Sequence, residues 1–348
     1  MILAGDIGGT KCNLALFGEQ GVVLRPVFQR RYSTRDYAHL QFEDLIEDFI
    51  RQATGPGSGI SEQEIIAAGF GSAGAVVDGR VQGINVPWAL DARALARKLG
   101  LGDVVLLNDL AATALSLDSL ASEDLLMLNQ GVAQPGATKA LIAAGTGLGE
   151  AFLFWDGQRH RAASSEGGQA DFAPRTDQEI ELLRFLKKRL PHVSCEEILS
   201  GRGFRRLHEF LNSAVRHPSF DAPDADPAAE ITQQALVRSC SVCVEALDLW
   251  TAAYGAEGGN FALRVLALGG VYVAGGIAPK ILPKMKDGTF VRSFCDKAKL
   301  APMLARIPIY LILNEDAPLW GVAYQALTTS RGYIDLEPAA RSAASGTG

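Results

Sequence analysis

Residues 2–11 read Ile-Leu-Ala-Gly-Asp-Ile-Gly-Gly-Thr-Lys, and this stretch decides the fold. It begins with an apolar run typical of a buried strand, and a second apolar run follows at residues 14–17. Two such runs joined by a Gly-Gly-Thr turn predict a β-hairpin. Because adjacent glycines let backbone N–H groups approach an anion closely, the turn of Gly8, Gly9 and Thr10 is a candidate phosphate cradle. The alternative is an ordinary glycine-rich hairpin turn.

Two charged residues flank this turn. Asp6 sets a carboxylate beside the candidate cradle, which is favourable if a cation lies between carboxylate and phosphate. Asp6 is therefore a candidate ligand of Mg²⁺ through water, and its alternative role is purely structural. Lys11 follows the turn directly, where it could contact a phosphate or face solvent. The sequence leaves both roles of Lys11 open.

Length and composition bound the class of protein. A chain of 348 residues with 48% apolar residues predicts about two globular domains. The net charge of −6 argues against nucleic-acid or anionic-membrane partners. We find no signal peptide and no run near the roughly 18 apolar residues of a membrane span. Five sparse cysteines are typical of a reduced, cytoplasmic protein.

The pattern of the opening returns near the middle of the chain. An apolar strand is predicted over residues 139–144, and a second strand over residues 151–155. Gly145, Thr146 and Gly147 lie in the turn between them. The sequence therefore contains two candidate phosphate turns, each between two strands.

Two further predicted strands end on residues suited to ligand binding. The strand at residues 104–107 leads into Asn108 and Asp109, and a late strand at residues 271–274 leads into Gly275 and Gly276. Open α/β sheets place ligands at the carboxyl ends of their strands. Asp109 is therefore a candidate general base, with a helix N-cap as its alternative role.

Cysteines and histidines give no clear metal motif. Helical patterns cover residues 228–254 and 260–268, and Cys240 and Cys243 lie within the first of them. We expect these two cysteines to be buried core residues rather than a redox or metal site. None of the five histidines is expected to join a metal cluster, and all are interpreted as structural or surface residues: His39, His160, His192, His208 and His217.

Two strand–turn–strand units followed by a late strand and Gly-Gly resemble the actin-like ATPase superfamily. The resemblance implies an α/β, actin-like ATPase (ribonuclease H-like) two-domain fold with a central cleft. The expected small domain is 1–115 plus 314–335, the large domain is 116–313, and residues 336–348 form a flexible tail. ATP would be held by the two turns at its phosphates and by the late glycines at its adenosine: Gly8, Gly9, Thr10, Gly145, Thr146, Gly147, Gly275 and Gly276.

Motifs over nearly the whole chain resemble the bacterial glucokinase family. In order they are Gly-Asp-Ile-Gly-Gly-Thr (5–10), Leu-Asn-Asp (107–109), Gly-Thr-Gly-Leu-Gly (145–149), Glu-Gly-Gly-x-x-Asp-Phe-Ala-Pro (166–174), His-Val-Ser-x-Glu (192–196), Leu-Ser-Gly (199–201) and Gly-Gly-Val-Tyr-Val-Ala-Gly-Gly-Ile (269–277). The related ROK sugar kinases usually carry a Cys-x-Cys-Gly-x-x-Gly-Cys zinc motif, which this sequence lacks. The chain therefore resembles the zinc-free branch.

This resemblance implies ATP- and Mg²⁺-dependent phosphorylation of glucose at O6 to glucose 6-phosphate, the first step of glycolysis, by a homodimer. Asp109 would be the general base, and the residues expected at the sugar are Asn85, Asn108, Asp109, Glu166, Gln169 and Glu196. From the residues alone, Glu166 could be a turn acid and Glu196 an acid favoured at a helix start.

Gln169 departs from the family, which usually has a sugar-binding histidine there. Glutamine can donate and accept hydrogen bonds but carries no charge. Another hexose, such as mannose or fructose, therefore stays open as the substrate. A non-catalytic sugar sensor and an ATPase of the Hsp70 or actin kind are further alternatives.

Overall fold

The structure is a computed structural model that describes residues 1–20, 23–82, 86–212, 220 and 225–331. It divides into two compact units. One comprises Met1–Ala121 together with the chain from Asp316 onward, and the other comprises Ser122–Glu315. Asn85 and the predicted tail at 336–348 lie outside the described residues.

The N-terminal unit is built on a five-stranded sheet of order β3-β2-β1-β4-β8. The predicted hairpin is confirmed, because β1 pairs antiparallel with β2 from Ile2↔Phe17 to Ile7↔Cys12. β4 then pairs parallel with both β1 and β8. The strands are β1 (Ile2–Ile7), β2 (Lys11–Gln20), β3 (Val23–Ser33), β4 (Ala67–Ser72) and β8 (Val104–Asn108), and β5 (Val76–Val77), β6 (Arg80–Gln82) and β7 (Ala89–Asp91) form a small second sheet.

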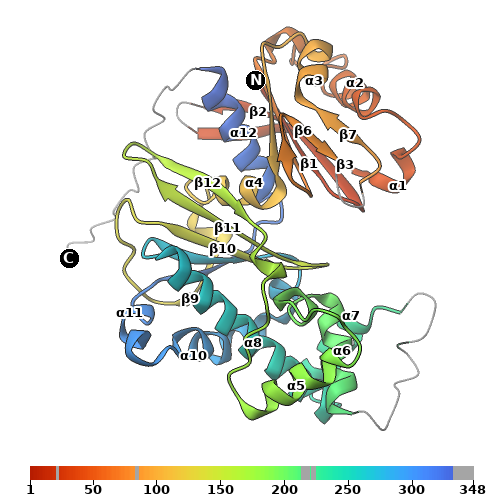
Figure 1. Cartoon of the computed structure of the whole chain (residues 1–348). Coiled ribbons are helices and arrows are strands. Elements are labelled where there is room, and N and C mark those ends of the chain that lie inside the picture. The colour runs from red at the N-terminus through yellow and green to blue at the C-terminus, as the bar shows by residue number, and fades with distance from the viewer. Residues whose placement is uncertain (21–22, 83–85, 213–219, 221–224, 332–348) are drawn as a thin grey trace. The chain divides into compact units, whose positions relative to one another are not determined.

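Helices cover this sheet and bury two apolar clusters. One cluster includes Phe42 and Phe49 of α2, and the other includes Leu319 and Val322 of α12. Figure 1 shows α12, in blue, beside the red N-terminal strands, so the end of the described chain completes the unit in which it starts. The helices are α1 (Thr34–Tyr37), α2 (Phe42–Ala53), η1 (Glu62–Glu64), α3 (Ala92–Leu99), α4 (Asp109–Ser116) and α12 (Ala317–Ser330).

The second unit is built on a six-stranded sheet of order β12-β11-β10-β13-β14-β9. β10 pairs antiparallel with β11 and parallel with β13, and β13 pairs parallel with β14. The first five strands of this order therefore repeat the directions found in the N-terminal unit. The strands are β9 (Leu125–Asn129), β10 (Lys139–Ala144), β11 (Leu148–Trp155), β12 (His160–Ser165), β13 (Gly270–Ala274) and β14 (Ile309–Ile312).

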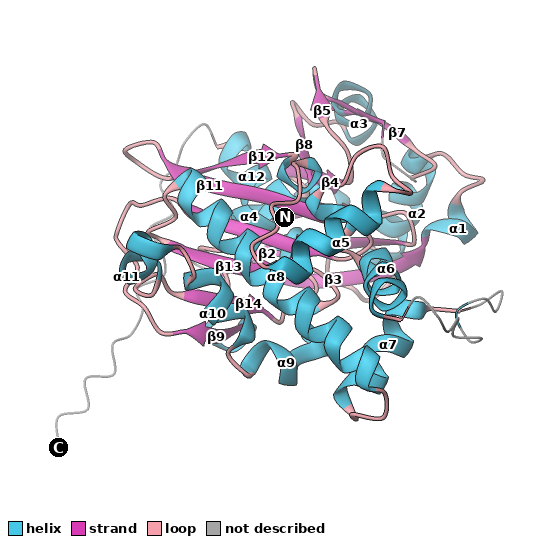
Figure 2. Ribbon diagram, turned by 60° about the horizontal axis from the view of Figure 1, so that its bottom comes forward, coloured by secondary structure: helices cyan, strands magenta, loops and turns pink. Residues whose placement is uncertain are grey.

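The long helix α8 dominates the helical layer of this unit (Figure 2). Its Trp250 and Tyr254 are fully buried, and the Tyr254 hydroxyl donates to the Ile142 carbonyl of β10 at 3.1 Å. The helices are η2 (Ser122–Asp124), η3 (Gly167–Gln169), α5 (Asp177–Lys187), η4 (Cys195–Glu197), α6 (Gly201–Leu211), α7 (Pro227–Leu236), α8 (Ser241–Val265), η6 (Ala278–Ile281), α9 (Leu282–Lys286), α10 (Thr289–Cys295), η7 (Ala298–Leu300) and α11 (Ala301–Leu304).

The boundaries predicted for the helices at 228–254 and 260–268 are wrong, because the structure has α7 and α8 there. The chain breaks between α7 and α8, where Arg238 has φ 57° and Cys240 is extended at φ −135°, ψ 116°. Neither conformation continues an α-helix. α8 then runs on through Gly255, where a Cβ would come within 2.1 Å of the Phe290 carbonyl oxygen. That glycine serves close helix packing and does not end the helix.

None of the described helices is long and apolar enough to span a membrane.

Candidate active site

The first glycine turn joins β1 to β2 and is held on two sides. The Gly8 N–H donates to the Lys11 carbonyl at 2.9 Å, which closes the turn. Thr34, at the start of α1, donates from its hydroxyl to the Gly8 carbonyl at 2.7 Å and from its N–H to the Thr10 carbonyl at 3.0 Å. Gly9 and Thr10 are exposed. The turn is therefore fixed in shape and open to a ligand.

Asn108 and Asp109 lie at the carboxyl end of β8, in line with the end of β1. The register pairs Ile7 with Ser72 and Ser72 with Asn108, so these three strand ends lie side by side. The parallel strands thus bring the candidate base to the edge of the sheet that carries the first glycine turn.

Asn108, rather than Asp109, caps helix α4. Its Oδ1 accepts from the N–H groups of Leu110 and Ala111 at 3.0 and 3.3 Å, and its Nδ2 donates to the Gly74 carbonyl at 3.2 Å. Asp109 is the first residue of the helix, and its Oδ1 accepts from the Leu110 N–H at 2.9 Å. The alternative role considered for Asp109, the N-cap, is therefore filled by its neighbour.

Asp6 has the surroundings of a cation ligand. Burial, and then the nearby negative charge of Asp109, raise the pKa of Asp6 to about 6. Asn13 offers a weak amide contact at 3.5 Å. Two carboxylates that disfavour each other's ionisation form an oxygen donor set that a hard cation such as Mg²⁺ would relieve. The residues present therefore fit Mg²⁺.

Lys11 is exposed at the start of β2. Burial and Asp109 raise the pKa of Asp6, and the positive charge of Lys11 partly offsets that rise. Lys11 therefore acts on the carboxylate beside the turn, and its contact with a phosphate stays a prediction.

The second glycine turn joins β10 to β11 and is braced by the segment that follows β12. The Leu148 N–H donates to Glu196 Oε2 at 3.1 Å, and the Gly201 N–H donates to the Gly145 carbonyl at 2.9 Å. A Cβ on Gly147 would lie 2.4 Å from Glu196 Oε2. A side chain at position 147 would therefore displace the carboxylate of Glu196 from the turn.

Gly275 and Gly276 reach the same turn from β13. Gly275 has φ 86°, and a Cβ there would lie 2.3 Å from the Ala144 carbonyl oxygen. The Ile277 N–H donates to that same carbonyl at 3.3 Å. Both glycines and Thr146 are exposed. The structure thus brings the late glycine pair against the second turn, within one unit.

The candidate sugar residues of this unit lie on two paired segments. Asp171 and Ser194 form an antiparallel bridge, flanked by backbone hydrogen bonds of 3.0 and 2.9 Å. This pairing places the segment with Glu166 and Gln169 beside the segment with Glu196. Glu166 and Gln169 are exposed, whereas Glu196 is half-buried.

Glu196 already has protein partners besides Leu148. Its Oε1 lies 3.3 Å from the Arg202 guanidinium. A carboxylate has about four acceptor positions, so these two contacts leave capacity for sugar hydroxyls. The alternative of Glu196 as a mere helix-start acid does not account for its contact with the turn.

Behind these segments lies a buried carboxylate that the sequence did not reveal. Glu150 is 1% exposed, and neither of its oxygens has a hydrogen-bond donor among the described residues. Burial, and then the charge of Glu257, raise the pKa of Glu150 to about 8, and Arg264 at 3.6 Å only partly offsets this. If Glu150 carries a proton, its carboxyl O–H can donate a hydrogen bond to the carboxylate of Glu257.

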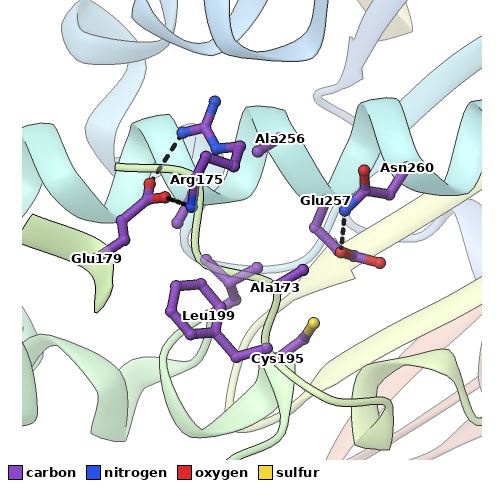
Figure 3. Close-up of a pocket in the computed structure, with 10 residues that line it drawn as sticks. Ala173, Arg175, Glu179, Cys195, Leu199, Ala256, Glu257 and Asn260 are labelled. Carbon is purple, nitrogen blue, oxygen red and sulfur yellow. Dashed lines mark hydrogen bonds and ion pairs between the residues drawn. The ribbon is translucent and has the colours of Figure 1, made fainter. Parts of the chain in front are cut away.

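A small pocket adjoins this carboxylate pair (Figure 3). On one side Arg175 pairs with Glu179 at 2.9 Å, and on the other the Asn260 amide donates to Glu257 at 3.0 Å. The Cys195 side chain also lines it. The pocket has room for about one water molecule, so it is not a sugar site.

Sequence reasoning missed three features. Thr34, which holds the first turn, gave no signal in the sequence. Glu150 follows the motif at 145–149 and precedes the strand predicted over residues 151–155, so its burial gave no signal. The expectation that no histidine joins a metal-like cluster is wrong for His208, because its ring nitrogen and the sulfurs of Cys240 and Cys243 lie within 4.8 Å of one another.

Two α/β units with repeated strand order, each with a glycine turn between antiparallel strands, define the actin-like ATPase fold. The family model for glucokinase matches residues 3–329. A glucokinase from Nostoc sp. is 38% identical over 344 residues, covering 93% of this chain and 98% of the relative. The chain belongs to the glucokinase family.

Solved structures agree with this assignment. A glucokinase from an Antarctic psychrotroph superposes with a TM-score of 0.83 at 26% identity, covering 94% of this chain and 98% of the other. A glucokinase from Balamuthia mandrillaris in complex with glucose gives a TM-score of 0.74 at 20% identity, covering 94% and 93%. At that identity the second likeness supports the fold alone.

Proposed function

We propose that this chain transfers the γ-phosphoryl group of ATP to O6 of glucose, giving glucose 6-phosphate and ADP. Membership of the glucokinase family supports the reaction. The observation that carries the residue assignment is the placement of Asp109 at the strand end beside Asp6 and the first glycine turn.

Asp109 accepts the O6 proton as the oxygen attacks phosphorus. The transferred group breaks its bond to the β,γ-bridging oxygen, which leaves with ADP. Little covalent chemistry is required of the protein, because positioning and charge neutralisation supply most of the catalysis. The hydrogen bond from Leu110 N–H holds the Asp109 carboxylate in one orientation.

The sugar is oriented by side chains that accept its hydroxyl protons. Glu166 and Glu196 are acceptors on adjoining segments, and Gln169 both donates and accepts. Asn108 contributes through the second hydrogen of its amide, since its oxygen caps α4. Asn85 remains a predicted sugar contact from the sequence.

The nucleotide is held by backbone groups. The turns at residues 8–10 and 145–147 contact its phosphates, and Gly275 and Gly276 adjoin the adenosine. Asp6 would hold Mg²⁺ through water, and the bound ion would supply charge neutralisation for the phosphates. Homodimerisation and a cytoplasmic location remain predictions, and sedimentation velocity would test the first.

The first test compares Asp109→Asn with Asp103→Asn in an assay of ADP release with glucose, ATP and Mg²⁺. The two aspartates flank β8, and each accepts a hydrogen bond from the N–H of the next residue. We expect Asp109→Asn to lower kcat by about 10²–10⁴-fold with glucose binding retained, and Asp103→Asn to be near wild type. An Asp109→Asn variant with more than about a tenth of wild-type kcat would refute the base assignment.

Gln169 favours one alternative within the same chemistry. It is exposed on η3 next to Glu166, where a family histidine would contact the sugar. A kinase for mannose or fructose would use the same base and the same nucleotide contacts. Comparing kcat/KM for these hexoses with that for glucose separates the two.

A further inference from the structure

Three soft or borderline ligand atoms meet at residues that have no assigned role in phosphoryl transfer. His208 lies on α6, Cys240 is the N-cap of α8, and Cys243 lies in the first turn of α8. One His ring nitrogen and the two sulfurs all lie within 4.8 Å of one another. That spacing matches ligands that share one ion, since Zn–S bonds are about 2.3 Å and Zn–N bonds about 2.0–2.1 Å.

The surroundings of the cluster are buried but reachable. His208 is 3% and Cys243 is 1% exposed, whereas Cys240 is half-buried. The His208 ring lies edge-on to Phe220, with ring centres 5.0 Å apart. The two inner ligands are thus shielded from water, and Cys240 provides the accessible side through which an ion could enter.

Cys240 lies at the N-terminal end of α8. Its sulfur accepts a hydrogen bond from the Cys243 N–H at 3.3 Å, at the positive end of the 25-residue helix α8. A bound cation would displace the thiol protons of both cysteines.

A fourth donor atom, an amide oxygen, lies beside the Cys243 sulfur. Gln234 Oε1 is 3.9 Å from the Cys243 sulfur. Its amide nitrogen donates to Glu230, and this contact turns the amide oxygen toward Cys243. Outer partners of this kind fix the orientation of metal ligands.

We propose that His208, Cys240 and Cys243 bind a Zn²⁺ ion, with Gln234 Oε1 completing a tetrahedral site. The donor set of two sulfurs, one imidazole nitrogen and one oxygen suits Zn²⁺ and disfavours Mg²⁺, which prefers oxygen ligands. The ion is structural and tethers α6 to the junction between α7 and α8.

This tether acts on a helix that braces the second glycine turn. Gly201, the first residue of α6, donates to the Gly145 carbonyl, and His208 lies two turns further along the helix. An ion at His208 would therefore stabilise the unit formed by Ser122–Glu315. Asp6, the proposed Mg²⁺ ligand, belongs to the other unit.

The test uses the full chain, purified under a thiol reductant, stripped with a chelator and titrated with Zn²⁺. We expect about one Zn²⁺ per chain with a Kd below about 1 µM. Zn²⁺ should raise the melting temperature of the wild type. Co²⁺ in its place should give a thiolate-to-metal charge-transfer band.

Variants identify the ligands. His208→Ala, Cys240→Ser and Cys243→Ser should each lose the charge-transfer band and the rise in melting temperature. Cys295→Ser and His39→Ala are the matched controls and should retain both, because Cys295 lies at the end of α10 and His39 is exposed.

A measurement on the wild type covers the case in which a variant fails to fold. Zn²⁺ should slow alkylation of Cys240 and Cys243, read by peptide mass spectrometry, and leave that of Cys295 unchanged. The proposal is wrong if Zn²⁺ binds more weakly than about 1 µM, or if it leaves alkylation of Cys240 unchanged. It is also wrong if the reduced protein keeps its zinc in the Cys240→Ser and His208→Ala variants.

Discussion

Because of Glu150, the free energy of unfolding of the unit formed by Ser122–Glu315 should fall as pH rises. The substitution Glu150→Gln should remove that pH dependence. The pKa of Glu150 is raised from 4.5 to about 8 in the folded chain, first by burial and then by Glu257. Between these values the folded state holds a proton that the unfolded state has released. Folding is therefore progressively disfavoured from about pH 4.5 up to about pH 8.

The size of the effect follows from the pKa difference. Each pKa unit corresponds to about 1.4 kcal/mol, so three pH units give at most about 4 kcal/mol between pH 5 and pH 8. Water penetration reduces this figure, and we expect about 2–4 kcal/mol. For a domain of 150–250 residues, this corresponds to roughly 4–16 °C in Tm. Glutamine keeps the shape of protonated Glu150 and can donate to Glu257 in its place.

The assay is thermal unfolding of wild type, Glu150→Gln and the exposed control Glu181→Gln between pH 5 and pH 9. The Tm difference between Glu150→Gln and wild type should grow with pH up to about pH 8 and then level off. Glu181→Gln should follow the wild type throughout. A Glu150→Gln difference that is flat across this range, or that shrinks as pH rises, would refute the raised pKa.

Three further substitutions probe the nucleotide and sugar contacts. Thr34→Val removes the hydroxyl that donates to the Gly8 carbonyl and should raise KM for ATP severalfold. The control Thr54→Val removes a similar hydrogen bond at the end of α2 and should leave KM for ATP unchanged. Equal effects of the two substitutions on KM would exclude a role for Thr34 in the turn. Gly275→Ala forces a Cβ against a carbonyl at φ 86° and should lower melting temperature and ATP affinity together, by about 1–3 kcal/mol in stability. Gln169→His should change the ratio of kcat/KM for glucose to that for mannose, and an unchanged ratio would remove this residue from specificity.

The sequence predicted the sheet framework because its signals were local. The glycine turns lie between apolar runs. The ends of α3 show the same local logic, because Asp91 caps its start and Gly100, at φ 65°, caps its end. The Ala94 N–H donates a hydrogen bond of 3.0 Å to Oδ1 of Asp91. Such signals depend only on neighbouring residues, so they can be recognised without tertiary contacts.

Features that depend on distant contacts could not be predicted. The break before Cys240 arises from backbone conformations that the helical apolar pattern did not reveal. His208 reaches the two cysteines only because α6 lies beside the start of α8. The raised pKa of Glu150 likewise depends on its burial in the folded chain and on the charge of Glu257, more than a hundred residues away in the sequence. The N-cap of α4, considered as an alternative role for Asp109, is filled by Asn108.

The most direct test of the central claim is the identity of the phosphorylated product. Purified chain, ATP and Mg²⁺ would be incubated in turn with glucose, mannose and fructose, with ADP release measured and the product's phosphate position determined by NMR. We predict the highest kcat/KM for glucose and a phosphate on O6. The Asp109→Asn variant should release ADP at less than about a tenth of the wild-type rate. Absence of ADP formation with every hexose, or phosphate on another oxygen, would contradict the account.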